Sequence, residues 1–325
     1  MGGVSTDKIR ELILSWQMMD AVELSRGSEE ALLALIDLAR EEDRTTKMRA
    51  LAALGEVLKG TDRKTKSLIL KNGFDAIVEA LNEGDERLNM RALGVLKRLV
   101  GETPLGKKQL VDLVDALASL VSRGEGLAWL EAVELAAKIS VPSPPDGVLS
   151  RMASLLNSPN LHGKALALRL LLNMGQPSSE NWGLILRGTA ELLRSGNPLL
   201  VEAALDALAD ILKLPSTAPM EGVLREILPV LKELTKTADN LVLRARAREV
   251  LGLLEGALYS YYRSRPGEAR NVVKKFLNAG LIDEAMILAL VVGDSSLLLG
   301  VDGEMQPPDV LGRTFDKLPG SPRGP

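Results

Sequence analysis

Three carboxylates, Glu202, Asp206 and Asp210, stand four residues apart in the segment VEAALDALADIL. A helix turns once in about 3.6 residues, so this spacing brings the three side chains to one helix face. Such a face can receive a basic partner or a hard cation, because carboxylate oxygens suit both. A solvated helix face has the same pattern and is the simpler interpretation. We therefore treat the three residues as candidate partner contacts and predict no metal site.

Basic residues gather in two stretches of a chain whose formal net charge is −3. Residues 44–71 contain eight Lys or Arg against two acids, and residues 244–275 contain eight against three, together with all three tyrosines. Arginine beside aromatic rings can bind phosphate groups and stacked bases, but tyrosines also pack in cores and arginines also pair with neighbouring acids. The candidate contact residues of the second stretch are Arg244, Arg246, Arg248, Tyr259 and Tyr262.

The composition excludes several kinds of active site. The chain has no cysteine, which excludes disulfides, thiolate metal sites and cysteine nucleophiles. The only histidine is His162, and a lone histidine at a helix start is most often a surface or capping residue. No glycine-rich phosphate loop and no GxSxG nucleophile elbow occurs. We therefore expect a protein that is not an enzyme and that uses no cofactor.

The same composition indicates an all-α protein. Hydrophobic residues make up 46% of the 325 residues and aromatic residues only 3%, while leucine and alanine, which favour helices, dominate. No stretch approaches the ~18 apolar residues of a membrane-spanning helix, and charges interrupt the N-terminal segment where a signal peptide would be apolar. The lack of cysteine fits a reducing compartment. We expect a cytoplasmic protein without a membrane partner.

Residues 74–100 show most clearly the kind of helical unit that must position the candidate residues. Phe74, Ile77, Val78 and Leu81 follow the helical spacing i, i+3, i+4 and i+7, which predicts one amphipathic helix. Turn-forming residues come next, and Asp85 can cap a second helix. The apolar stripe of that second helix consists of Leu88, Ala92, Val95, Leu96 and Leu99. Neither helix can bury its stripe alone, so the pair needs neighbours.

This pair of helices recurs along the chain. The sequence MRAL occurs at residues 48–51 and again at residues 90–93, and the alanine of this motif returns at intervals of 35 to 43 residues. The recurring alanines are Ala50, Ala92, Ala132, Ala167, Ala204 and Ala247. Intervals of this length with two helices per unit are typical of helical solenoids. A small residue lets two helix backbones approach closely, which gives the recurrence a packing reason.

The repeat resembles the HEAT and armadillo families. In the HEAT pattern a turn with Asp or Asn leads into a second helix that carries a basic residue before a buried alanine. The residues that match this pattern are Asp85, Arg91 and Ala92, then Asp43, Arg49 and Ala50, then Asp239, Arg246 and Ala247. Leu228 to Leu231 resemble the proline-containing first helix of the family. The middle units depart from the pattern, with Glu131 and Glu202 at the basic position.

The resemblance implies an all-α superhelix, an armadillo-like solenoid of about six two-helix repeats with helical caps. We expect an N-terminal cap at residues 1–27, the repeats at 28–264, a C-terminal cap at 265–299 and a disordered tail at 300–325, in which Phe315 and Leu318 could form a linear motif. Family members with iron-binding histidines are excluded because His162 stands alone. No residue matches the active site of the HEAT-like DNA glycosylases, and Trp16, Trp129 and Trp182 are scattered over the units.

A curved surface made by successive second helices is suited to binding proteins. The first hypothesis is therefore a non-enzymatic scaffold or adaptor that binds protein partners through its concave second-helix face, with Arg91 and Arg98 among the contacts. The alternative is a nucleic-acid-associated HEAT protein that uses residues 244–275.

Overall fold

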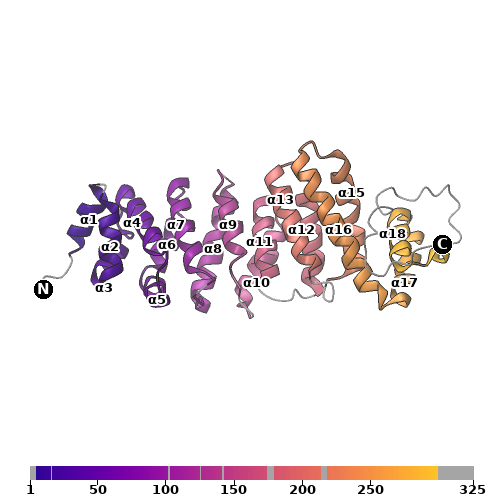
Figure 1. Ribbon diagram of the computed structural model, residues 1–325, viewed down its shortest axis with the longest axis horizontal. Helices are drawn as coiled ribbons and strands as arrows, with labels where there is room; N and C mark the ends of the chain where they lie inside the picture. Colours follow the sequence, from indigo (N-terminus) through magenta and orange to yellow (C-terminus); the bar gives the residue numbers. More distant parts are fainter. Residues whose placement is uncertain are drawn as a thin grey trace. The chain divides into compact units, whose positions relative to one another are not determined.

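The computed structural model describes residues 5–15, 17–101, 103–124, 126–140, 143–173, 179–213 and 218–298. This part of the chain forms 18 α-helices and one short 3-10 helix and contains no β-strand (Figure 1). It divides into two compact units, residues 1–177 and 178–325. The all-α prediction is confirmed. The predicted tail, residues 300–325, and Trp16 lie outside the described residues.

The first unit begins with two cap helices, which are followed by four helix pairs. The cap helices are α1 (Thr6–Leu14) and α2 (Met18–Gly27). The pairs comprise α3 (Glu29–Leu38) and α4 (Arg44–Val57); α5 (Arg63–Asn72) and α6 (Phe74–Ala80) with α7 (Glu86–Leu99); α8 (Lys107–Arg123) and α9 (Ala128–Ala136); and α10 (Asp146–Asn157) and α11 (Leu161–Asn173). The second helices α4, α7, α9 and α11 pack on one another in sequence.

The second unit contains two further repeats and a terminal helix pair. The repeats comprise α12 (Ser179–Leu193) and α13 (Pro198–Leu212), then α14 (Met220–Glu226) and α15 (Leu228–Thr237) with α16 (Leu241–Arg263). The terminal elements are α17 (Pro266–Asn278), α18 (Ile282–Val292) and the 3-10 helix η1 (Ser295–Leu298). The second helices α13 and α16 pack on each other, and α18 packs on α16. The described residues thus form six two-helix repeats with helical caps, as the sequence predicts.

The predicted hairpin at residues 74–100 is confirmed in detail. The Asp85 side chain accepts a hydrogen bond from the Leu88 amide at 3.1 Å, so it caps α7 as expected. Gly84, just before it, has a φ of 74°, which a side chain would strain. All five apolar residues of the predicted stripe on α7 are buried. The sequence did not reveal that α5 precedes α6, so that the first helix of this repeat has two segments.

Two first helices are broken. At Gly73, between α5 and α6, an added Cβ would come within 3.2 Å of the Ile36 side chain and of the Ile69 carbonyl oxygen, so a larger residue would have to move both. The second break is at Ile227, and Pro229 lies in the first turn of α15. Proline fits there because its missing N–H would have had no helical partner. The family-like proline thus begins a helix segment and is not internal to one.

The recurring alanines lie where the second helices meet. Each of the six is at most 1% exposed, and the helices that carry them pack side by side within each unit. This confirms that the repeated small residue is a packing residue.

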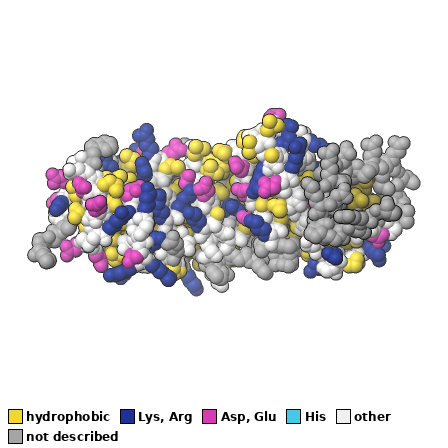
Figure 2. Space-filling view, in the orientation of Figure 1, with side chains coloured by type: hydrophobic (Ala, Val, Ile, Leu, Met, Phe, Trp, Pro, Cys, Tyr) yellow, Lys and Arg dark blue, Asp and Glu magenta, His cyan; other side chains and the backbone are white. Residues whose placement is uncertain are grey.

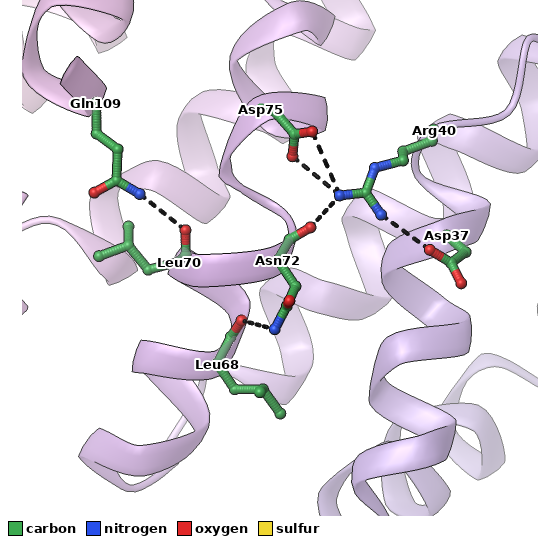
Figure 3. A network of polar contacts seen from close by, with 7 residues as sticks. All are labelled: Asp37, Arg40, Leu68, Leu70, Asn72, Asp75 and Gln109. Carbon is green, nitrogen blue, oxygen red and sulfur yellow. Dashed lines mark hydrogen bonds and ion pairs between the residues drawn. The ribbon is translucent and has the colours of Figure 1, made fainter. Parts of the chain in front are cut away.

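In the first unit, polar side chains connect neighbouring repeats by reaching helix ends about one repeat away. Arg40 lies between Asp37 at 2.9 Å and Asp75 at 3.1 Å and also donates to the carbonyl oxygen of Asn72, at the end of α5 (Figure 3). Gln109 donates to the Leu70 carbonyl oxygen at 3.0 Å. The last carbonyls of a helix have no partner within it, so these donors satisfy groups that the helix leaves open. Polar residues of this kind therefore stabilise the contacts between repeats.

Candidate binding faces

The second helix α7 carries a row of arginines on its exposed side. Arg87 and Arg91 are exposed, while Arg98 is half-buried and donates from its Nη1 to the Gly94 carbonyl oxygen at 2.9 Å. Positions 87, 91, 94 and 98 follow helical spacing and so share one face. Lys and Arg side chains gather over this part of the molecule in Figure 2. The predicted contacts Arg91 and Arg98 thus lie together on one helix face.

Most carboxylates around this row are bound to other groups. Lys97 pairs with both Glu131 and Glu134 on α9, and Lys59 pairs with Glu56 on α4 at 2.8 Å. Glu86 accepts a hydrogen bond from the Leu127 amide at 2.7 Å. Among the described residues Arg87 and Arg91 form no ion pair. They are cations available to a partner.

A pocket opens next to Arg91. It has a volume of about 680 Å³ and lies between the junction of α1 and α2, the exposed face of α4 and the arginine row of α7. Its lining includes three methionines, Met18, Met19 and Met48, and the Met19 residue is 52% exposed. Hydrophobic side chains are visible beside Lys and Arg over this end of the first unit in Figure 2. This is an apolar concavity with a basic edge.

In the second unit the three predicted carboxylates lie on the exposed face of α13. Asp206 accepts a bond from Arg246 of α16 at 2.8 Å, and Asp210 pairs with Lys213 at 2.7 Å. Glu202 is exposed. No group of three or more metal-ligand side chains with suitable geometry occurs in the part of the chain that the structure describes. Asp206 thus links α13 to the next second helix, α16, and Glu202 is the carboxylate of the three that is exposed to solvent.

The predicted basic and aromatic region at residues 244–275 is largely engaged in local contacts. Arg244 donates to the Ala238 carbonyl oxygen at 2.6 Å, and Arg246 pairs with Glu249 at 2.7 Å as well as with Asp206. Arg248 is exposed. Only part of the predicted cationic surface is therefore presented to solvent.

The tyrosines of this region do not form an open stacking platform. Tyr262 is 0% exposed, so it is a core residue and cannot meet a partner as predicted. The Arg263 guanidinium lies 5.6 Å from the ring centre of Tyr259, and Arg265 lies 4.2 Å from that of Tyr261. Burial raises the pKa of Tyr262. In the last turns of α16 these rings contact the core or neighbouring arginines, which favours the packing interpretation that the sequence left open.

His162 lies in the first turn of α11 and packs against the buried Trp129, with ring centres 4.6 Å apart. Partial burial lowers the pKa of the imidazole because the charged form loses hydration. His162 therefore supports the packing of α9 against α11.

Acidification is expected to destabilise the first unit through His162. The unfolded imidazole has a pKa of about 6.5, and the folded one has a lower pKa, so the unfolded state takes up a proton first. The stability contributed by the neutral ring is present above pH 6.5, falls as the pH drops through the folded pKa, and then levels off. Because the chain has one histidine, proton NMR of the imidazole measures this pKa directly. A value at or above that of an unstructured peptide would contradict the burial of His162.

These features define an α-solenoid in which the second helices α7, α13 and α16 carry exposed charged residues. Among solved structures the chain is similar to a HEAT-like repeats protein from the archaeon Thermococcus onnurineus NA1, at 30% identity and a TM-score of 0.66, covering 79% of this chain and 99% of that one. The chain belongs to the HEAT-like repeat proteins, a group of the HEAT and armadillo type.

Two further solved structures are similar at lower identity. An engineered protein matches at 21% identity and a TM-score of 0.48, covering 69% of this chain and 98% of that one. A designed armadillo repeat protein in complex with the peptide (KR)4 matches at 18% identity and a TM-score of 0.43, covering 69% and 99%. No protein-family profile and no curated protein matches the chain. In the described residues, no helix combines the length and apolar character needed to cross a membrane.

Sequence reasoning missed the methionine-lined pocket. The available signal was the repeat itself, because Met48 and Met90 occupy the same motif position in neighbouring units. Both are partly exposed on second helices. An apolar residue that recurs at an outward position of a repeat indicates a contact surface more directly than a charged residue does.

Proposed function

We propose that this chain is a non-enzymatic scaffold or adaptor that binds protein partners through its second-helix faces. The observation that carries the proposal is that some basic side chains are bound to groups of the neighbouring repeat, whereas others have no such partner and can contact another protein. Side chains such as Arg40, Lys47 and Lys97 are engaged in contacts between repeats, whereas Arg87 and Arg91 stand without a carboxylate partner among the described residues. Cations kept available on an ordered helix face favour an interaction surface.

The chemistry of the candidate residues supports binding over catalysis. Asp206 and Asp210 are held by basic side chains, and His162 packs on Trp129. Acid–base catalysis needs a titratable group within hydrogen-bond reach of a substrate proton. The exposed second helices instead offer a broad, mixed surface of the kind that solenoids use for large partners.

The nucleic-acid alternative has less support. A nucleic-acid surface needs a basic path and exposed rings for stacking, but Arg246 is neutralised by two acids and Tyr262 is buried. Fluorescence anisotropy with a labelled oligonucleotide at ~100 mM salt tests this alternative, since phosphate binding weakens steeply with salt. Tight, salt-sensitive binding that Arg248→Ala abolishes would revive it.

The proposal is tested by comparing the two faces with matched charge reversals. Arg91→Glu on α7 and Glu202→Arg on α13 alter the second-helix faces, while Arg63→Glu on α5 and Glu233→Arg on α15 make the same changes on exposed first helices. Partners recovered from native lysate by the full chain should be lost with at least one second-helix variant and retained with both controls.

The opposite result would contradict the proposal. The first-helix side has its own acidic groove between α6 and α8, lined by Glu79, Asp112 and Asp115 with Phe74 and Val78 at its base. If Glu79→Arg removes partners that both second-helix variants retain, the binding face is the first-helix side. Circular dichroism of each variant confirms that a lost partner does not reflect lost folding.

A further inference from the structure

The methionine-lined pocket is formed where the N-terminal cap meets the first two repeats. The residues of α4 that line it, Thr45, Met48, Ala52 and Glu56, are at least partly exposed, follow one another at three- or four-residue intervals and form a continuous stripe. The next second helix, α7, packs on one side of α4, as in the following repeats, but on the other side the cap helices α1 and α2 take the place of a preceding second helix. Here the junction of α1 and α2 stands across the stripe and leaves a hollow.

The wall of the pocket is fixed by a charged residue of α4. Arg49 donates from its Nη1 to the carbonyl oxygens of Leu14 at 2.6 Å and Ile13 at 3.1 Å, which lie at the C-terminal end of α1. A cation is favourable there because it complements the negative end of the helix dipole. The Arg49 side chain therefore holds the end of α1 against α4. The hollow is part of the folded cap and does not have to be opened by a ligand.

The lining is adaptable as well as apolar. Met18, Met19 and Met48 line the hollow, and Met90, which is 36% exposed, lies one helical position before Arg91. These are four of the ten methionines in the chain. Methionine side chains are flexible and polarizable and are common on surfaces that accept varied apolar side chains. A volume of about 680 Å³ falls within the range of roughly 300–1,000 Å³ that holds a drug-sized ligand, so two neighbouring apolar side chains fit.

The charge at the edge selects the partner. Arg91 lines the pocket from α7, and Arg87 lies one turn before it on the same helix face. The nearby acid Glu56 pairs with Lys59. Asp20 lines the opposite edge, on α2. A segment that enters over α7 therefore meets two available guanidinium groups, which bind carboxylates in bidentate geometry.

We propose that this pocket binds an acidic peptide segment of a partner protein, with one or two large apolar side chains inserted among the methionines and adjacent Asp or Glu carboxylates on Arg91 and Arg87. The inference rests on the proposed function and specifies the partner chemistry at one place on the second-helix face. A nucleic acid fits less well, because none of the described lining residues has an aromatic ring for base stacking. A basic peptide would meet like charge at α7.

The test is a selection of random displayed peptides on the full chain. Enriched peptides are expected to combine a Leu, Met, Ile or Phe with an Asp or Glu within about four positions. Binding of the best peptide is then measured by fluorescence anisotropy. Arg91→Glu is expected to weaken binding by about tenfold or more, since it replaces an attraction by a repulsion.

Two further variants separate the apolar contact from the charge contact. Ala52→Phe fills part of the hollow from α4 and should reduce affinity for the apolar anchor without altering charge. Arg63→Glu, on α5 and outside the pocket, changes the net charge as Arg91→Glu does and should leave affinity unchanged. Thermal unfolding checks that each variant is folded.

The proposal is overturned if no peptide is enriched, if the enriched peptides are neutral or basic, or if binding is insensitive to both Arg91→Glu and Ala52→Phe. If lysate partners still depend on the second-helix faces in any of these cases, the proposed function stands and only the acidic-peptide inference fails. If lysate partners are also independent of those faces, both fail. If a labelled oligonucleotide binds this pocket and Ala52→Phe, which fills the pocket, abolishes that binding, the ligand is a nucleic acid and not an acidic peptide.

Discussion

Replacing Glu83 with alanine is expected to lower the free energy of unfolding of the first unit by about 2 to 3 kcal/mol, because it leaves a buried charge without its partner. Lys47 on α4 is only 7% exposed, and its ammonium pairs with Glu83, which precedes α7 in the next repeat. The acid therefore compensates a cation that has lost most of its hydration. Urea unfolding followed by circular dichroism measures the change.

The double variant Lys47→Met/Glu83→Leu is the matched control. Removing both charges removes the desolvation cost together with the attraction, so this variant is expected to lie within about 1 kcal/mol of the parent. A double variant as unstable as Glu83→Ala would mean that the carboxylate acts through packing. An unchanged stability in Glu83→Ala would mean that water reaches Lys47 and that the pair resembles an exposed one.

Replacing Ala92 with leucine is expected to lower stability by about 1 to 3 kcal/mol through overpacking. Ala92 is 0% exposed and lies on α7, which packs against α4 on one side and α9 on the other. Because Ala92 is fully buried between these helices, the added atoms are expected to push the neighbouring second helices apart. Hydrogen exchange should show loss of protection in α4 and α9 as well as in α7, because solenoid stability depends on contacts between neighbours.

Gly94→Ala on the same helix is the control for Ala92→Leu. An added Cβ at Gly94 meets only the Arg98 side chain, at 3.8 Å, which is ordinary contact. Glycine inside a helix is less favourable than alanine by about 0.5 to 1 kcal/mol, so this variant should gain stability. Loss of stability in both variants would show that α7 tolerates no added atoms, and a neutral Ala92→Leu would contradict the packing role of the repeated alanine.

The scaffold could be predicted from the sequence because its determinants are local and repeated. Helical spacing at Phe74 to Leu81, the cap at Asp85 and the recurring alanine each depend on a few neighbouring residues, and all three are confirmed. Helix breaks are less visible. The break at Gly73 depends on the approach of Ile36 from the preceding repeat, which no local pattern reveals.

The candidate surfaces were harder to predict because the exposure of a charged side chain depends on residues one repeat away. Arg246 has the same repeat position as Arg91, yet Arg246 is paired with Asp206 of the preceding second helix and Arg91 has no such acid. Tyr262 has an aromatic ring that could stack on a base, but it lies on the buried face of α16. The methionine-lined pocket requires the cap to stand across α4, and sequence spacing does not give that arrangement.

Site-specific photo-crosslinking tests the proposed binding face most directly. A photoreactive amino acid is placed at Met90 on α7 and at Glu202 on α13, and at Glu79 on α6 and Glu233 on α15 as exposed first-helix controls. Partner proteins are then trapped by irradiation in native lysate and identified by mass spectrometry. At least one of the second-helix positions is expected to trap partners that the first-helix positions do not. Trapping of those partners only from Glu79 or Glu233 would contradict binding through the second-helix faces.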